Sequence, residues 1–290
     1  MRARLPDQAG YVERGGVRLG YEVFGDDAGP TILLLPTWTI IHSRFWKMQV
    51  PYLSRHFRVI TYDGPGNGRS DRVTDPERYG PISYAEDAAA VLEATSTDRA
   101  IVVGLSLGGQ YGAALAVAHP ERVAGLVMIG PSIPLTPPSP ERAAAAESFG
   151  KPYPDGVEGW GKYNLAYWHD HYADFAQFFF GQCFNEPHST KPIEDSVGWA
   201  LEAGPEILEA EWAAPILTQD WPGYMGRVQC PTLIIHGTRD RISPHARGVE
   251  AARLTGAVML SMEGSGHIPN VRDPVKVNLA IRDFVERVAS

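Results

Sequence analysis

Gly104-Leu105-Ser106-Leu107-Gly108-Gly109 decides the fold of this chain. It follows Ala100-Ile101-Val102-Val103, a β-branched run that predicts a buried strand, and it leads into small, helix-tolerant residues from 109 to 118. A strand, a tight turn and a helix in this order hold a serine in strained backbone geometry, with its hydroxyl clear of the sheet. The stretch therefore predicts that Ser106 is a nucleophile, with the backbone N–H of Leu107 at the positive end of the helix.

Two further apolar runs, near the C-terminus, end in polar residues that suit a serine nucleophile. The run 231–236 leads into a turn with Asp240, and the run 257–260 leads into a glycine-rich loop with His267. These positions give the chain order Ser, Asp, His. We expect His267 to act as the general base and Asp240 to orient its imidazole. No carboxylate stands at 130–132, where an alternative acid would have to lie.

The chain resembles the α/β-hydrolase family along nearly its whole length. Besides the Ser106 motif, the matches are a hairpin-like opening, a strand before a loop, a D-x-x-G-x-G-x-S-x segment and a G-x-x-D-x-x-x-P turn, at residues 11–25, 31–35, 63–71 and 237–244. The resemblance implies an α/β fold with a doubly wound, mostly parallel eight-stranded sheet and a helical cap inserted after the sixth strand. Within the glycine-rich segment, we expect Asp63 to bond the backbone of its own turn.

One position departs from the family pattern. The pair His-Gly that usually follows the strand ending at Leu35 is here Pro36-Thr37. By position, the resemblance implies that the oxyanion N–H groups come from Trp38 and Leu107. We expect another backbone arrangement to aim the first of these amides, and a damaged oxyanion hole is the alternative. The hydroxyl of Thr37 or Thr39 is a further candidate donor.

The pattern of predicted elements and the residue composition divide the chain into three parts. Residues 1–130 and 227–290 alternate predicted strands and helices and form the predicted core domain. Residues 131–226 begin with a proline cluster, contain a helix start at Ser139-Pro140-Glu141 and are dense in aromatic residues, so we expect the cap there. Candidate substrate-binding residues are Trp38, His42, Trp168 and Tyr172.

Composition excludes several classes of partner. The chain of 290 residues has a net charge of −8 and no basic run, which argues against nucleic acid and anionic membrane. No apolar run approaches about 20 residues, so we expect no membrane span, and the basic segment Met1 to Pro6 lacks the apolar stretch of a signal peptide. The two cysteines, Cys183 and Cys230, favour a reduced, cytoplasmic setting. The pattern implies no metal and no cofactor.

We therefore expect a hydrolase that cleaves a carboxylic ester-type bond of a small, largely hydrophobic substrate. The bond would be an ester, lactone or thioester, and Ser106 would carry the acyl group. Two alternatives stay open: a carbon–carbon bond hydrolase acting beside a ketone, and a slow-turnover ligand sensor or inactive relative that signals to a protein partner. A sensor would bind its ligand with near-zero turnover, whereas a hydrolase would turn over many times. The oligomeric state is left open.

Overall fold

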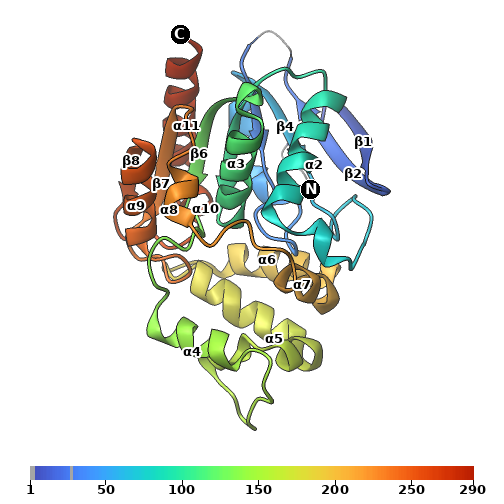
Figure 1. The fold of residues 1–290 in the computed structure, drawn as a ribbon, viewed down its shortest axis with the longest axis vertical. Coiled ribbons are helices and arrows are strands. Elements are labelled where there is room, and N and C mark those ends of the chain that lie inside the picture. The colour runs from blue at the N-terminus through green and yellow to red at the C-terminus, as the bar shows by residue number, and fades with distance from the viewer. Residues whose placement is uncertain (1–3, 27–28) are drawn as a thin grey trace.

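Eight strands form one sheet in the computed structural model, which describes residues 4–26 and 29–290 (Figure 1). Residues 1–3 of the basic N-terminal segment lie outside the described residues. The strands are β1 (Gln8–Arg14), β2 (Val17–Phe24), β3 (Thr31–Leu34), β4 (Arg58–Tyr62), β5 (Ala100–Leu105), β6 (Val123–Ile129), β7 (Thr232–Gly237) and β8 (Val258–Met262).

The sheet is mostly parallel. Its strand order is β1-β2-β4-β3-β5-β6-β7-β8, and only the pairings of β2 with β1 and with β4 are antiparallel. The order reverses between β3 and β4, so the chain winds outward from the centre in both directions. The predicted doubly wound sheet is confirmed, and the carboxyl ends of β3, β5, β6, β7 and β8 all meet at one edge.

Helices cover both faces of the sheet. α2 (Pro81–Ala94), α3 (Leu107–Ala118) and α9 (His245–Thr255) pack on one face, while α1 (Val50–Leu53), α10 (Pro269–Arg272) and α11 (Pro274–Ala289) pack on the other. β5 is buried along its whole length, as expected for a strand covered on both sides. Its residues alternate between the two cores: Val103 belongs to the same core as Phe284 of α11, and Val102 belongs to the same core as Tyr111 of α3.

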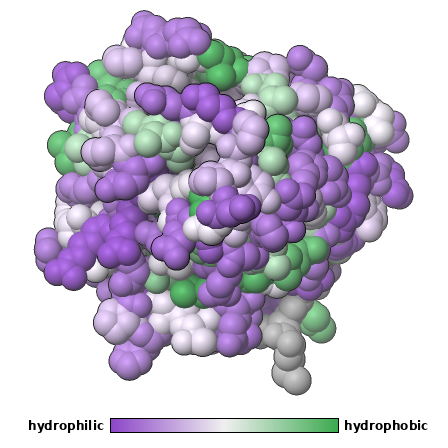
Figure 2. All heavy atoms as spheres, turned by 90° about the horizontal axis from the view of Figure 1, so that it is seen from below, coloured by the Kyte–Doolittle hydropathy of each residue, from purple (hydrophilic) through white to green (hydrophobic). Residues whose placement is uncertain are grey.

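The segment between β6 and β7 forms a separate group of helices below the sheet in Figure 1. It holds α4 (Pro140–Ser148), α5 (Leu165–Cys183), α6 (Thr190–Ala203) and α7 (Pro205–Trp212), whereas α8 (Trp221–Met225) packs on α9. The Ser139 side chain accepts a hydrogen bond from the Arg142 N–H, so the predicted helix start is confirmed. The outer face of this group is mainly hydrophilic, with hydrophobic side chains scattered over it (Figure 2).

Short 3-10 helices lie in the connections between these elements, at Ser43–Met48, Pro76–Arg78, Pro120–Arg122 and Gly159–Lys162. Within the described ranges, no helix is both long and apolar enough to cross a bilayer.

Candidate active site

Ser106 lies at a strained turn between β5 and α3. Its backbone has φ 56° and ψ −117°, a region that non-glycine residues rarely adopt, and its N–H donates to the Ile129 carbonyl at 3.0 Å. A Cβ on Gly104 would collide with the Gly108 carbonyl, so only glycine allows the turn to close. Strain of this kind concentrates at functional sites, and here it projects the Ser106 hydroxyl beyond the carboxyl end of β5.

Asp240 and His267 come together although 26 residues separate them in the chain. The Nδ1 atom of His267 lies 2.7 Å from Oδ2 of Asp240, and the backbone N–H groups of Ile242 and Ser243 donate to the other oxygen, Oδ1, at 2.7 and 2.9 Å. A carboxylate can only accept, so His267 carries its proton on Nδ1. The lone pair of its Nε2 is then available to take a proton.

The loop that carries His267 is held from the segment after α5. The His267 N–H donates to the Cys183 carbonyl at 3.2 Å, and the Gly266 N–H donates to the Glu186 carboxylate at 2.7 Å. A side chain at residue 266 would press on Asn185, because an added Cβ would lie 2.6 Å from its Oδ1. The position of the imidazole therefore depends on the helices between β6 and β7 as well as on the sheet.

A second histidine, His236, contacts the same carboxylate oxygen, and no sequence pattern predicted this contact. His236 is fully buried at the end of β7, with Nε2 at 3.0 Å from Asp240 Oδ2 and 2.9 Å from the Ser243 carbonyl. Both neighbours are acceptors, so Nε2 carries the proton and donates. The only sequence signal was its position four residues before Asp240.

These contacts set the charge of Asp240. Burial alone would raise the pKa of this carboxyl, but the nearby His267 and the hydrogen bonds from His236 and His267 hold the pKa of Asp240 well below its usual range. The carboxylate is therefore ionised at neutral pH, which is the state that stabilises a protonated His267.

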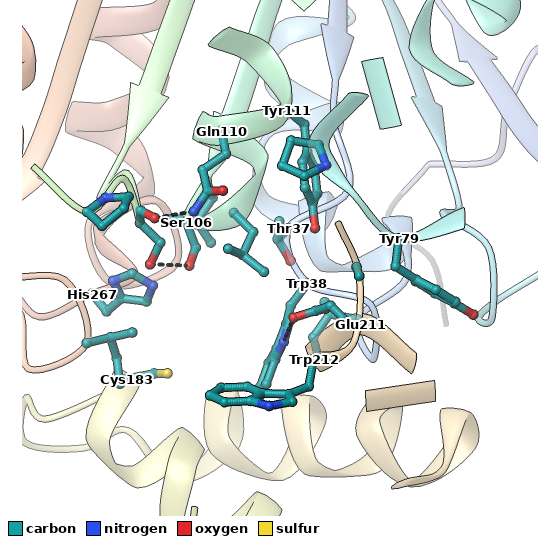
Figure 3. A pocket seen from close by; sticks show the side chains of 18 of the residues that line it. Thr37, Trp38, Tyr79, Ser106, Gln110, Tyr111, Cys183, Glu211, Trp212 and His267 are labelled. Carbon is teal, nitrogen blue, oxygen red and sulfur yellow. Dashed lines mark hydrogen bonds between the residues drawn. The ribbon is translucent and has the colours of Figure 1, made fainter. Parts of the chain in front are cut away.

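Ser106 and His267 both line one cavity of about 580 Å³ between the carboxyl ends of the strands and α4–α7 (Figure 3). The Ser106 hydroxyl donates to the Ser132 hydroxyl at 3.4 Å, and no hydrogen bond joins it to His267 within the part of the chain that the structure describes. Long contacts of this kind are common in unliganded sites and tighten when substrate binds. Most other lining residues are apolar or aromatic and include Trp38, Ile41, Phe45, Tyr163, Phe179, Phe180, Trp212, Trp221 and Ile268.

The loop of residues 36–41 contacts the turn at Ser106; because the sequence predicts an oxyanion donor in it, we call it the oxyanion loop below. A Cβ on Gly108 would lie 2.6 Å from the Pro36 carbonyl oxygen, so the two backbones touch. Leu107 is the first residue of α3, and its N–H has no acceptor within the helix. Trp38 and Thr37 line the cavity, and the Trp38 ring packs on Phe179 of α5 with ring centres 4.5 Å apart.

Three of the four candidate substrate-binding residues do not reach the cavity. His42 is buried, accepts a hydrogen bond from the Arg44 N–H and lies 3.6 Å from Glu202 of α6. Tyr172 donates to the Ala200 carbonyl at 3.1 Å and ties α5 to α6. Trp168 is fully buried among other aromatic residues of the segment 131–226. At Trp168 and Tyr172 the aromatic residues of the segment 131–226 therefore pack within that segment. Of the four candidates, only Trp38 lines the cavity.

Trp168 gives a test of that core. Its ring packs edge-on against Phe149 at 4.8 Å and Tyr163 at 5.1 Å, so truncation would leave a large void. We expect Trp168→Ala to lower the free energy of unfolding by about 3–5 kcal/mol, measured by urea denaturation. Leu201→Ala, on the exposed side of α6, is the control and should change stability by less than about 0.5 kcal/mol. Equal effects of the two substitutions would contradict the assignment of Trp168 to the core.

No group of three or more His, Cys, Asp or Glu side chains in the described ranges is arranged to hold a metal ion. The two cysteines are free thiols: Cys183 is buried beside the cavity, and burial raises its pKa, as it does that of Cys230.

A doubly wound sheet with a serine at a strained strand-to-helix turn defines the class of α/β hydrolases. Residues 30–274 match the family described as the alpha/beta hydrolase fold. The chain therefore belongs to the α/β-hydrolase family, and the resemblance found in the sequence is confirmed.

Several of the relatives have names that describe hydrolases. The pimeloyl-[acyl-carrier protein] methyl ester esterase of Aromatoleum aromaticum is 30% identical over 262 residues, which cover 88% of this chain and 98% of the relative. The putative carbamate hydrolase RutD of Caulobacter segnis is 38% identical over 110 residues, but the match spans only 41% of its length and 38% of this chain. Among solved structures, a hydrolase from Pseudomonas aeruginosa PA01 has a TM-score of 0.77 and 26% identity, with coverage of 96% of this chain and 98% of that one. Est816, an N-acyl homoserine lactone degrading enzyme, shares the fold with a TM-score of 0.78 at 24% identity, covering 95% and 100% of the two chains.

Proposed function

We propose that this protein hydrolyses a carboxylic ester-type bond of a small, largely hydrophobic molecule through an acyl-enzyme on Ser106. One observation carries the proposal: Ser106, at its strained turn, lines the same cavity as His267, whose Nδ1 is 2.7 Å from the ionised Asp240. The ester-cleaving relative that spans nearly the whole chain supports the same bond type.

In the proposed mechanism, His267 Nε2 takes the proton of the Ser106 hydroxyl as its oxygen attacks the substrate carbonyl. The tetrahedral oxyanion receives hydrogen bonds from the N–H groups of Trp38 and Leu107. Collapse expels the alcohol, which takes the proton from His267. Water then attacks the acyl group with the same help, releasing the acid and restoring Ser106.

We propose further that residues 131–226 act as a cap that shapes the substrate site, with residues 1–130 and 227–290 as the catalytic core. The cavity has the size of a small-molecule site, and most of its lining residues are apolar or aromatic. Arg142 of α4 is the one arginine among the lining residues that the structure describes, but its guanidinium packs over the Trp160 ring at 5.1 Å and donates to the Ile242 carbonyl. Because this cation already has partners in the wall, the apolar lining supports an uncharged acyl chain as substrate.

A chain-length series of p-nitrophenyl esters tests the proposal. We expect multiple turnovers, with kcat/KM highest for acyl chains of roughly four to eight carbons and falling for longer chains that exceed the cavity. The measurement is steady-state release of p-nitrophenol. A single burst that stops, or no release at any chain length, would contradict ester hydrolysis and favour the sensor or the carbon–carbon bond hydrolase.

A further inference from the structure

The oxyanion loop is held by a carboxylate from helix α7, which is far from it in the chain. Glu211 of α7 accepts a hydrogen bond from the Trp38 indole N–H at 3.0 Å on Oε1. Its other oxygen, Oε2, accepts from the Thr39 backbone N–H at 3.3 Å and from the Thr39 hydroxyl. Three donors from two successive residues of the loop therefore converge on one side chain that lies 172 residues further along the chain.

We propose that Glu211 is a positioning residue that holds the oxyanion loop in its working geometry and ties that loop to α7. The proposal rests on the function proposed above, because it concerns the N–H of Trp38 as an oxyanion donor. Glu211 lies beside Trp38 in the cavity wall (Figure 3), and its contacts fix the side chain of Trp38 and the residue that follows it, Thr39. These three hydrogen bonds, called the clamp below, give the loop a rigidity that Pro36-Thr37 does not supply by itself.

The two threonines of the loop have different environments. The Thr39 hydroxyl is committed to Glu211, and the Thr39 carbonyl accepts from the Asn67 side chain, so this residue is fixed from both sides. Thr37 instead lines the cavity. The sequence offered the hydroxyls of Thr37 and Thr39 as candidate donors. Because Thr39 is bonded to Glu211, Thr37 is the candidate whose residue lines the cavity.

The charge of Glu211 matters for the clamp. The Trp38 indole and the Thr39 backbone N–H can only donate, whereas the Thr39 hydroxyl can donate or accept. The ionised carboxylate accepts from all three, and a protonated carboxyl keeps its contacts only by turning its O–H toward the Thr39 hydroxyl. Burial raises the pKa of Glu211 to about 7, although the hydrogen bonds from Thr39 and Trp38 favour the ionised form. The charge-assisted clamp is therefore complete above pH 7 and weakens as the pH falls through that value.

The groups that face Glu211 from neighbouring elements do not titrate in this range. They are tyrosines that follow the 3-10 helix Pro76–Arg78 or lie in α2, α3 and the segment 131–226, and burial raises the pKa of each above its ordinary value: Tyr79, Tyr84, Tyr111, Tyr163 and Tyr172. The charged groups nearest these tyrosines are Arg72, Arg78, Asp75, Asp87, Arg142 and Glu206.

The test compares Glu211→Gln with Glu209→Gln, which makes the same change in charge on the exposed side of α7, where Glu209 pairs with His169. In Glu211→Gln the new NH2 group must face either the indole N–H or the Thr39 N–H, so one donor pair is opposed. We expect kcat for a p-nitrophenyl ester to fall about 10- to 100-fold at pH 8 with KM changed less than about threefold. Glu209→Gln should keep the kcat of the wild type.

The pH profile separates positioning from a purely structural effect. The ratio of wild-type to Glu211→Gln kcat should shrink between pH 8 and pH 5.5, because protonation of Glu211 weakens the same contacts that the glutamine weakens. A ratio that stays constant with pH, an unchanged kcat, or a loss confined to KM would overturn the proposal.

A second measurement does not need turnover. The indole N–H proton of Trp38, assigned in the NMR spectrum by its loss in Trp38→Phe, should titrate near pH 7 in the wild type and not in Glu211→Gln. An indole resonance that does not titrate in the wild type would overturn the clamp. If the wild type turned over no ester, the proposed function would fail, while this resonance would still decide whether the clamp exists.

Discussion

Ser106→Ala should abolish multiple turnover of p-nitrophenyl esters, with kcat reduced by at least about four orders of magnitude. The variant lacks the oxygen that forms the acyl bond, and no other hydroxyl in the described chain occupies the strained turn after β5. The fold should persist, because alanine removes only an oxygen whose hydrogen bond to Ser132 is 3.4 Å long. Residual activity above the rate in buffer would come from substrate binding and the oxyanion hole.

Two measurements accompany that variant. Ser148→Ala, whose hydroxyl bonds only carbonyls of its own helix α4, is the matched control and should keep wild-type kcat. A fluorophosphonate should add its phosphonyl group to Ser106 of the wild type, with loss of fluoride, and leave Ser106→Ala unlabelled in the intact mass. Retention of even a tenth of the turnover in Ser106→Ala would point to another nucleophile.

The contacts between the segment 131–226 and two loops of the cavity have a common consequence. Cys183 and Glu186 bond the loop of His267, and Glu211 bonds the oxyanion loop. In the proposed mechanism these loops carry the base and one oxyanion donor, while Ser106 lies at the turn after β5. In that mechanism, displacement of the segment 131–226 would disturb proton transfer and charge stabilisation together, without moving the nucleophile.

The parts of the site that the sequence predicted are those defined by local pattern. The strand before Ser106, the turn and the helix after it are adjacent in the chain, and each has its own signal in residue type. The same holds for Asp63, whose expected bond to its own turn is confirmed by the Arg69 N–H at 2.9 Å. The parallel part of the sheet could also be predicted from the sequence, because its strands are short apolar runs that alternate with predicted helices.

The parts that the sequence did not predict depend on which face of a helix meets the cavity. Trp168 and Phe179 both belong to α5, yet only Phe179 lines the cavity, and aromatic density is the same signal for both. Glu211 gave no signal because its partners are Trp38 and Thr39, 172 or more residues earlier. Contacts at that separation arise because the segment 131–226 packs on the rest of the chain, which no local pattern describes.

Asp240→Asn should lower kcat by about four orders of magnitude at neutral pH while the protein stays folded. All four groups that reach this side chain are donors: the backbone N–H groups of Ile242 and Ser243 on Oδ1, and the imidazoles of His236 and His267 on Oδ2. The backbone donors cannot turn away, so the asparagine keeps its carbonyl oxygen toward them. Its NH2 group then faces His267.

An NH2 group at that position reverses the hydrogen bond to the imidazole. His267 Nδ1 must become the acceptor, its proton moves to Nε2, and the nitrogen that should take the Ser106 proton is blocked. The measurement is kcat for the best ester of the series, with Asp283→Asn, an exposed aspartate on α11, as the control for the change in charge. Phosphonylation of Ser106 should slow in parallel with kcat, because both reactions need the same proton acceptor. Normal turnover in Asp240→Asn would mean that another acid orients His267.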